Sequence, residues 1–430
     1  MSLLAQDSKF PVHTLRGHTS SITASEFVRV PISTRAKTIT LKEQHNKTTL
    51  KPFLLSADDS GKLILWDLTI LRPLKTVQGH NTQVLTIRQL GIKDNEIDSR
   101  YFGLVLTHGR DHTIKFWKIF DESGVISFDL VYELPVNALN FSNVDIIDDI
   151  IVTPNTQNSN TFDIYDISFL SHEKVDDSRL KRLFEAVDVY KTAVERDYSK
   201  FEEFNIKRDE MDDDVNRTDK FGIIMKLLFI TKELLFIGYE SGHVAQIRLN
   251  RDSKTFEIIN IEHQHYPNPV LSLTFDKIHN VVLSTSIGSN IVIHSLEKKD
   301  AVDVKLSKFG KISGVAVVHD KYIISSWNGY IRFYKLGSDH TSLEYLANFK
   351  KPKGLLAGDL NIIGNINNDA EAIGEKSTTI KPTSLEVYQE VEVVDPLIKK
   401  GIHRRDLKVI ETSCLAVGYG DGTITLYNDL

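Results

Sequence analysis

Short runs of alternating apolar and polar residues recur along the chain, in pairs joined by a tight turn. In Phe53–Leu68, FLLSADDSGKLILWDL, an apolar run is followed by Asp, Ser and Gly and then by a second run. Alternation with a period of two is typical of β-strands, and turn residues between two such runs predict a β-hairpin. Six further segments repeat the pattern: Gly103–Ile119, Asp149–Ile167, Leu234–Leu249, Asn280–Leu296, Lys321–Leu336 and Cys414–Leu430.

Another short apolar strand is predicted before six of these seven hairpins. The segments are ITASEFV (22–28), VLTIRQL (84–90), VNALNFS (136–142), IIMKLLFI (223–230), VLSLTF (270–275) and ISGVAVV (312–318). The seventh hairpin has no clear counterpart. A unit of several antiparallel strands that recurs along a chain is the sequence pattern of a β-propeller, in which each unit forms one blade.

The first two repeats carry the motifs by which the chain resembles the WD-repeat family. Gly17-His18 and Gly79-His80 precede them, and they end in LILWD and IKFWK. The resemblance implies an all-β fold, a seven-bladed WD-repeat β-propeller that forms a single domain over residues 1–430. In repeats three to six, other residues stand at the Trp position: Tyr165, Ile247, His294 and Tyr334.

The last repeat lacks an outermost strand, because the sequence ends directly after its hairpin. The segment FPVHTLRGH near the N-terminus belongs to no earlier blade and is predicted to supply that strand. Such a clasp would close the ring and leave no open sheet edge between the first and last blades.

Composition narrows the class of protein and the ligands it is expected to bind. The net charge of −6 disfavours direct binding to nucleic acid, and the single cysteine, Cys414, indicates a reducing compartment. The chain starts without a secretory pattern, and its apolar runs are too short for a bilayer, so we expect a soluble intracellular protein. His263 and His265 are a pair without a third metal ligand, and no cofactor is expected.

Four residues of repeat two invite comparison with a catalytic relay: His80, Thr107, Asp111 and Trp117. No nucleophile elbow or glycine-rich oxyanion loop precedes Thr107, so we expect no enzyme activity. The resemblance to WD repeats instead implies a buried structural hydrogen-bond chain. Repeat one keeps His18, Ser56 and Trp66 but has Ser60 where the Asp would fall, so its tetrad is predicted to be partial.

Three insertions interrupt the repeat rhythm, at residues 30–50 within blade one, 171–220 between blades three and four, and 350–407 between blades six and seven. The second is highly charged, and its apolar residues recur at three- and four-residue steps between Leu180 and Phe201. This predicts an amphipathic helix, although RLFEAVDVYK within it also fits an outer strand of blade three. Helix and strand both remain open from the sequence.

The combination of LRGHTSSITASEFV at the start, a charged insertion after a degenerate third repeat, LLFIGYESGHV and the final LAVGYGDGTITLY resembles the fungal ASTRA-associated protein 1 family. The resemblance implies a non-catalytic scaffold subunit of a nuclear ASTRA-type complex, present in the nucleus and also the cytoplasm. Its implied partners are RuvB-like AAA+ ATPases, the Tel-two/Tti chaperone group and a transcription-associated kinase-like protein. The implied roles are chromatin regulation and maturation of phosphatidylinositol-3-kinase-related kinases.

An alternative function is a histone-tail or peptide reader that uses the mouth of the propeller. Trp327, in the turn SSWNGY of repeat six, is the candidate partner contact for such a reader. The alternative is that Trp327 is a partly buried residue of the turn without a binding role.

Overall fold

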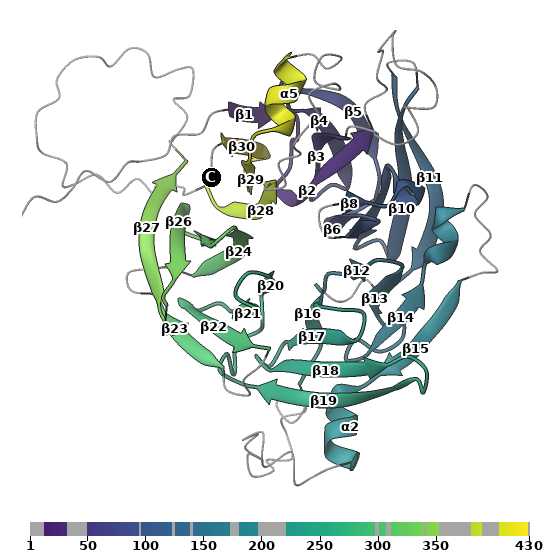
Figure 1. Ribbon diagram of the computed structural model, residues 1–430, viewed down its shortest axis with the longest axis vertical. Helices are drawn as coiled ribbons and strands as arrows, with labels where there is room; N and C mark the ends of the chain where they lie inside the picture. The colour runs from purple at the N-terminus through teal and green to yellow at the C-terminus, as the bar shows by residue number, and fades with distance from the viewer. Residues whose placement is uncertain are drawn as a thin grey trace, which may run out of the picture.

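The computed structural model describes residues 13–31, 50–93, 96–122, 125–137, 141–172, 180–196, 221–296, 301–306, 311–338, 341–351, 380–388 and 404–428. Their strands form seven four-stranded antiparallel sheets arranged in a ring around a central opening (Figure 1). The predicted seven-bladed β-propeller is confirmed.

The first four blades follow one another along the chain. In each blade the first strand borders the central opening and the fourth lies at the rim (Figure 1). Their strands are β2 (Ile22–Pro31), β3 (Leu50–Asp58), β4 (Lys62–Asp67) and β5 (Arg72–Gln78); β6 (Val84–Gln89), β9 (Leu104–Gly109), β10 (Thr113–Glu122) and β11 (Val125–Pro135); β12 (Asp145–Ile147), β13 (Ile150–Pro154), β14 (Phe162–Asp166) and β15 (Lys181–Val187); and β16 (Ile224–Phe229), β17 (Leu234–Tyr239), β18 (Val244–Asn250) and β19 (Thr255–Glu262).

Blade seven contains both ends of the described chain. Its strand order is β28-β29-β30-β1, and β1 (His13–Arg16) pairs with β30 in antiparallel register from His13–Leu426 to Arg16–Thr423. The predicted N-terminal clasp is therefore confirmed. The strands of blades five to seven are β20 (Ser272–Asp276), β21 (Val281–Thr285), β22 (Asn290–Ser295) and β23 (Val302–Lys305); β24 (Ile312–Val318), β25 (Lys321–Ser326), β26 (Tyr330–Leu336) and β27 (Leu343–Lys350); and β28 (Pro382–Tyr388), β29 (Cys414–Tyr419) and β30 (Thr423–Asn428).

Glycines in the hairpin turns let neighbouring blades approach closely. Gly61 has φ +84°, and its carbonyl oxygen accepts hydrogen bonds from the N–H groups of Gly79 and His80 at 3.1 Å. A Cβ on Gly61 would lie 2.1 Å from the carbonyl oxygen of His80. Gly422 of blade seven, with φ +78°, packs in the same way on His18 of blade one. The Gly-His segment of one blade therefore docks on the turn glycine of the blade before it.

The inner strands of two blades differ from the sequence-based expectation. Blade three begins with β12 at Asp145, so the predicted strand 136–142 is wrong, and Val136 and Asn137 are outside strands. Blade seven does have an inner strand, β28, which lies inside the range 350–407 that we assigned to an insertion. Those seven residues belong to the ring, because the Pro382–Tyr388 strand pairs with β29.

The charged insertion at 171–220 also contributes to the ring. Its first part forms β15, the outer strand of blade three, and α2 (Val189–Arg196) follows it. A single helix from Leu180 to Phe201 is therefore wrong, and the strand alternative is right for the first half. Residues 197–220, like 32–49 of the blade-one insertion, lie outside the described part of the chain.

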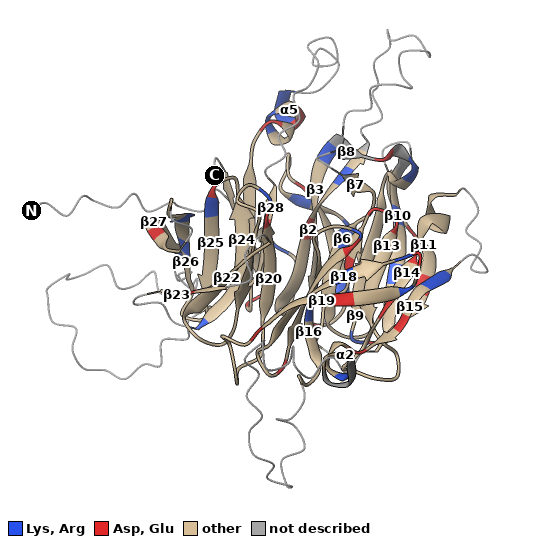
Figure 2. Ribbon diagram, turned by 60° about the horizontal axis from the view of Figure 1, so that its bottom comes forward, with Lys and Arg blue, Asp and Glu red and all other residues tan. Residues whose placement is uncertain are grey.

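Different helices and hairpins lie on the two faces of the ring. Figure 2 shows α5 (Arg404–Ile410) and the small hairpin of β7 (Ile92–Lys93) and β8 (Glu96–Ile97) on one face and α2 on the other. Short 3-10 turns occur at Ser99–Tyr101 and Ser168–Ser171. No helix in the described ranges is long and apolar enough to cross a membrane.

Candidate functional site

The four relay-like residues of blade two meet in one hydrogen-bond chain. His80 Nδ1 lies 2.9 Å from Asp111 Oδ1, and His80 Nε2 lies 2.8 Å from Thr107 Oγ1. The indole N–H of Trp117 donates to Thr107 Oγ1 at 2.8 Å. Because a carboxylate only accepts, His80 donates from Nδ1, and its Nε2 accepts from the threonine hydroxyl. Each N–H and O–H group of these side chains therefore donates one hydrogen bond within the tetrad.

This chain has the order of a hydrolase triad without access to a substrate. Thr107 is fully buried, and its hydroxyl oxygen already accepts a hydrogen bond from the indole N–H of Trp117. Burial lowers the pKa of His80, so its imidazole is neutral at pH 7. Burial alone would raise the pKa of Asp111, but hydrogen bonds from Asn81 N–H and from His80 lower it below its ordinary value. The geometry ties together the turn, β9 and β10.

The prediction of a partial tetrad in blade one is wrong. Asp58, two residues before Ser60, supplies the carboxylate, and His18 Nδ1 lies 2.8 Å from its Oδ2. His18 Nε2 lies 2.7 Å from Ser56 Oγ, which also accepts from Trp66 Nε1 at 2.8 Å. Ser60 donates its N–H and its hydroxyl to Asp58 Oδ1. The acid comes from the end of β3 here and from inside the turn in blade two, and both positions reach the histidine.

Blade five has a shorter version of this hydrogen-bond chain, in which the role of Ser284 was not predicted from the sequence. The buried Ser284 hydroxyl lies 2.8 Å from His265 Nε2 and 2.7 Å from His294 Nε2. His265 occupies the position of the Gly-His histidine, and His294 that of the tryptophan. Burial lowers the pKa of His265 to about 4 and that of His294 to about 3. The described residues contain no group of three or more His, Cys, Asp or Glu placed to hold a metal ion.

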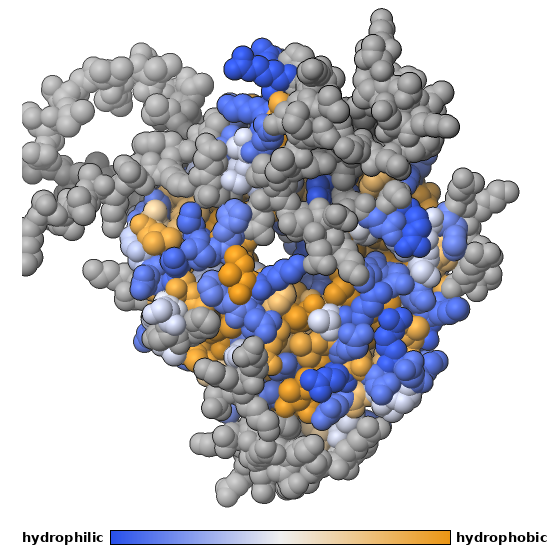
Figure 3. Space-filling view, in the orientation of Figure 1, coloured by the Kyte–Doolittle hydropathy of each residue, from blue (hydrophilic) through white to orange (hydrophobic). Residues whose placement is uncertain are grey.

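Charged side chains from several inner strands gather around the central opening, which is hollow in the space-filling view (Figure 3). Arg88 Nη1 lies 3.1 Å from Glu26 Oε2, and Arg88 Nε lies 3.9 Å from Asp145 Oδ1. Burial raises the pKa of Asp145 to about 6 and raises that of Glu386 well above its usual range. Burial also lowers the pKa of Lys226 to about 8. The ion pairs of Arg88 link the neighbouring blades one, two and three along the wall of the channel.

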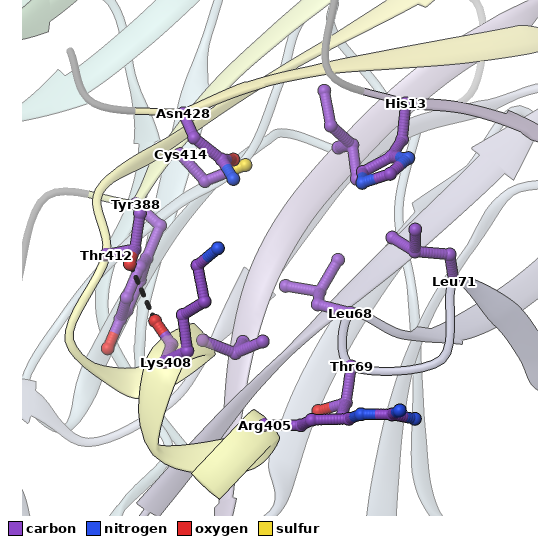
Figure 4. A pocket seen from close by; sticks show the side chains of 12 residues that line it. His13, Leu68, Thr69, Leu71, Tyr388, Arg405, Lys408, Thr412, Cys414 and Asn428 are labelled. Atoms are coloured by element: carbon purple, nitrogen blue, oxygen red, sulfur yellow. Dashed lines mark hydrogen bonds between the residues drawn. The ribbon is translucent and has the colours of Figure 1, made fainter.

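A cavity of about 190 Å³ lies where blades one and seven meet (Figure 4). Its walls come from β1, the β4–β5 turn, α5 and blade seven, and they include His13, Leu68, Leu71, Lys408 and Cys414. Below it, α5 is tied to blade one, because Lys51 Nζ lies 2.5 Å from Asp406 Oδ1 and 3.0 Å from Asp67 Oδ2. The cavity therefore lies at the closure of the ring, and its lining combines apolar side chains with Arg405 and Lys408.

Trp327 lies in the turn between β25 and β26 and is 38% exposed. Two ammonium groups lie over its ring, Lys311 Nζ at 5.1 Å and Lys381 Nζ at 5.0 Å from the ring centroid. Its N–H donates to the carbonyl oxygen of Lys311 at 2.8 Å, which fixes the turn against the blade 5–6 connection. A histone-tail reader needs acidic and aromatic groups around its ligand, whereas this tryptophan is surrounded by the chain's own lysines.

Comparison with protein families gives a match over almost the whole chain. The family model described as ASTRA-associated protein 1 matches residues 11–427. A protein of that name from Candida albicans is 32% identical over 415 residues, covering 88% of this chain and 93% of its own length. Namesakes from Candida tropicalis and Meyerozyma guilliermondii are 30% and 27% identical, and each alignment covers 96% of this chain and 98% of the relative.

Two solved structures share the fold at low sequence identity. Saccharomyces cerevisiae Sqt1 is 9% identical, with a TM-score of 0.55, over 98% of this chain and 99% of that chain. Chaetomium thermophilum Raptor is 10% identical, with a TM-score of 0.57, over 99% of this chain and 29% of that chain. Both similarities support the propeller fold alone.

Proposed function

The chain belongs to the ASTRA-associated protein 1 family, and from this membership we propose that it is a non-catalytic WD-repeat scaffold subunit of a nuclear ASTRA-type complex. The proposed partners are RuvB-like AAA+ ATPases, the Tel-two/Tti chaperone group and a transcription-associated kinase-like protein. Through them the protein would act in chromatin regulation and in maturation of phosphatidylinositol-3-kinase-related kinases. The proposed location is the nucleus, with a cytoplasmic fraction.

The observation that carries the proposal is the family match over residues 11–427, which spans all seven blades. The scaffold role is supported by the burial of the relay-like hydroxyls of Ser56, Thr107 and Ser284, none of which reaches solvent. Rigid blades with connections of very different length on both faces are a common basis for binding several partners. A role as a reader of basic tails is disfavoured by the lysines around Trp327.

The test is affinity purification of the tagged protein at its native expression level, followed by mass spectrometry. The RuvB-like ATPases and the kinase-maturation factors are expected in the purified fraction and absent from an untagged strain. A variant that breaks the ring closure, such as removal of β1, should reduce both protein abundance and recovery. Recovery of intact protein without any of these factors would overturn the proposal.

A further inference from the structure

We propose that the turn face of blades six and seven is a docking surface for an acidic, extended segment of a partner protein. This blade 6–7 basic surface consists of Lys311, Trp327, Tyr330, Arg332, Lys350 and Lys381. The inference rests on the proposed scaffold function and adds the chemistry of one partner contact.

The surface begins at the mouth of the central opening. Lys311 directly precedes the inner strand β24 and Lys381 directly precedes the inner strand β28, and these two strands are neighbours in the ring (Figure 1). Both lysines are exposed, and both direct their ammonium groups over the ring of Trp327. Two ammonium groups at a single exposed ring form a local concentration of positive charge, which attracts an anionic ligand.

The same chemistry continues outward along blade six. Lys350 Nζ lies 4.9 Å and Arg332 Cζ lies 5.3 Å from the ring centroid of Tyr330. Tyr330 and Lys350 are directly paired across β26 and β27, so their side chains share one side of the sheet. Trp327 lies in the turn and Tyr330 begins β26 three residues later, so the two cation-and-ring groups are neighbours along the chain.

Charge complementarity favours an acidic peptide as the ligand of this surface. Within the described ranges, no carboxylate forms an ion pair with Lys311, Lys350 or Lys381, while the neighbouring Lys351 is paired with Asp421 at 2.5 Å. The chain as a whole carries a net charge of −6, so this cationic group departs from the average surface. Successive carboxylates along an extended peptide can contact the ammonium groups of Lys311, Lys350 and Lys381.

Single-stranded nucleic acid fits this surface less well. Bases bind proteins by stacking on open aromatic faces, and that stacking supplies much of the affinity. Here the rings of Trp327 and Tyr330 each already have two of the protein's own cations over them, at 4.9–5.3 Å from the ring centroids, and these cations compete with a stacking base. Carboxylates can reach the ammonium groups without a free ring face.

The experiment uses the full chain and a fluorescein-labelled peptide that alternates Glu with Leu. About ten residues suffice, since an extended chain advances about 3.3 Å per residue. Fluorescence anisotropy should detect binding that weakens as salt concentration rises. The double variant K311Q/K381Q should lose at least about tenfold in affinity, because it removes both ammonium groups at Trp327. W327F should bind nearly as well as the wild type, whereas W327A should bind more weakly.

The matched control is K75Q/K181Q, which removes the same charge from exposed lysines on the outer strands of blades one and three. It should leave peptide affinity within about twofold, because screening limits the effect of distant charges. Equal loss in both double variants, or no loss in K311Q/K381Q, would overturn the docking surface. Tighter binding of an oligothymidylate than of the peptide would assign the surface to nucleic acid instead.

The same variants separate this inference from the proposed function. If wild-type protein recovers the ASTRA factors but K311Q/K381Q leaves peptide affinity unchanged, the docking surface is wrong and the scaffold role stands. If wild-type protein recovers none of the factors, the scaffold role fails whatever the peptide does. Thermal unfolding of each variant confirms that a loss of affinity does not come from a loss of fold.

Discussion

Replacing Asp58 with alanine should destabilise the protein strongly, although local sequence alignment of the repeats gives this residue no role. The Asp58 side chain is fully buried and accepts four hydrogen bonds. They come from His18 Nδ1 at 2.8 Å, from the N–H and hydroxyl of Ser60 at 3.0 and 2.6 Å, and from Lys62 N–H at 3.1 Å. It therefore holds the turn and the Gly-His segment together.

The size of the stability loss depends on which hydrogen-bond donors stay buried without an acceptor when the Asp58 carboxylate is removed. The His18 imidazole is buried, so losing its acceptor costs about 1–3 kcal/mol, and losing the bonds to the turn costs about 1 kcal/mol more. We expect Asp58→Ala to lower the free energy of unfolding by about 3 kcal/mol. Ser60→Ala, which removes one hydroxyl, should lower it by about 1 kcal/mol.

The measurement is equilibrium unfolding in urea, followed by tryptophan fluorescence, since Trp66 donates to the same hydrogen-bond chain. Asp59→Ala is the matched control, because Asp59 is the adjacent carboxylate and is exposed; we expect a change below about 0.5 kcal/mol. Similar losses from Asp58→Ala and Asp59→Ala would refute the tetrad in blade one. A larger loss from Ser60→Ala than from Asp58→Ala would restore the sequence-based assignment.

Three further predictions concern the clasp, acid stability and the cysteine. Leu15→Ala should cost about 2–4 kcal/mol, because Leu15 is 2% exposed in β1, and deleting residues 1–16 should lower the Tm further; an unchanged Tm after the deletion would exclude the clasp. Stability should fall as pH drops from 6.5 toward 4, because burial lowers the pKa of His108 and His294 to about 3 and of His243 and His265 to about 4, so the unfolded chain binds protons that the folded chain does not. Each histidine contributes up to about 2 kcal/mol between pH 6.5 and 5, partly offset by Asp145 and Glu386, whose raised pKa values have the opposite effect. Equal Tm values at pH 7.5 and 5 would contradict this. Cys414 should react with a thiol reagent only when the protein unfolds, because it is 7% exposed and burial raises its pKa to about 12; rapid labelling of the native protein would show that blade seven opens.

Much of the ring could be predicted because its elements are local. Each hairpin is encoded within about seventeen residues by alternation and turn chemistry, and seven such units with one missing outer strand predict the clasp by β1. The inner strands of blades three and seven were harder to predict from the sequence. In blade three only the three residues of β12 form the strand, and in blade seven β28 is separated from β29 by α5, so neither has a neighbouring pattern to mark it.

The candidate sites depended on contacts that sequence spacing does not encode. Asp58 and Asp111 reach their histidines from different positions of the turn, and Ser284 joins His265 to His294 at a site where no WD signature remains. The sequence singled out Trp327 as a candidate partner contact. Only the structure shows that Lys381, 54 positions further along and in the next blade, lies over its ring. That contact reverses the charge of the partner we expect.

The sequence by itself determined the hairpins, their number and the closure of the ring, because alternation and turn residues act over a few neighbouring residues. Only the tertiary structure decided which carboxylate completes each tetrad, which charges meet in the channel and which lysines surround Trp327. These contacts join residues that are distant in sequence, within one blade for the tetrads and between blades for the channel charges and for Lys381 with Trp327. Alternation along the chain does not encode them, because their distances are set only when the blades fold and pack, as where the Gly79-His80 segment docks on Gly61 of blade one.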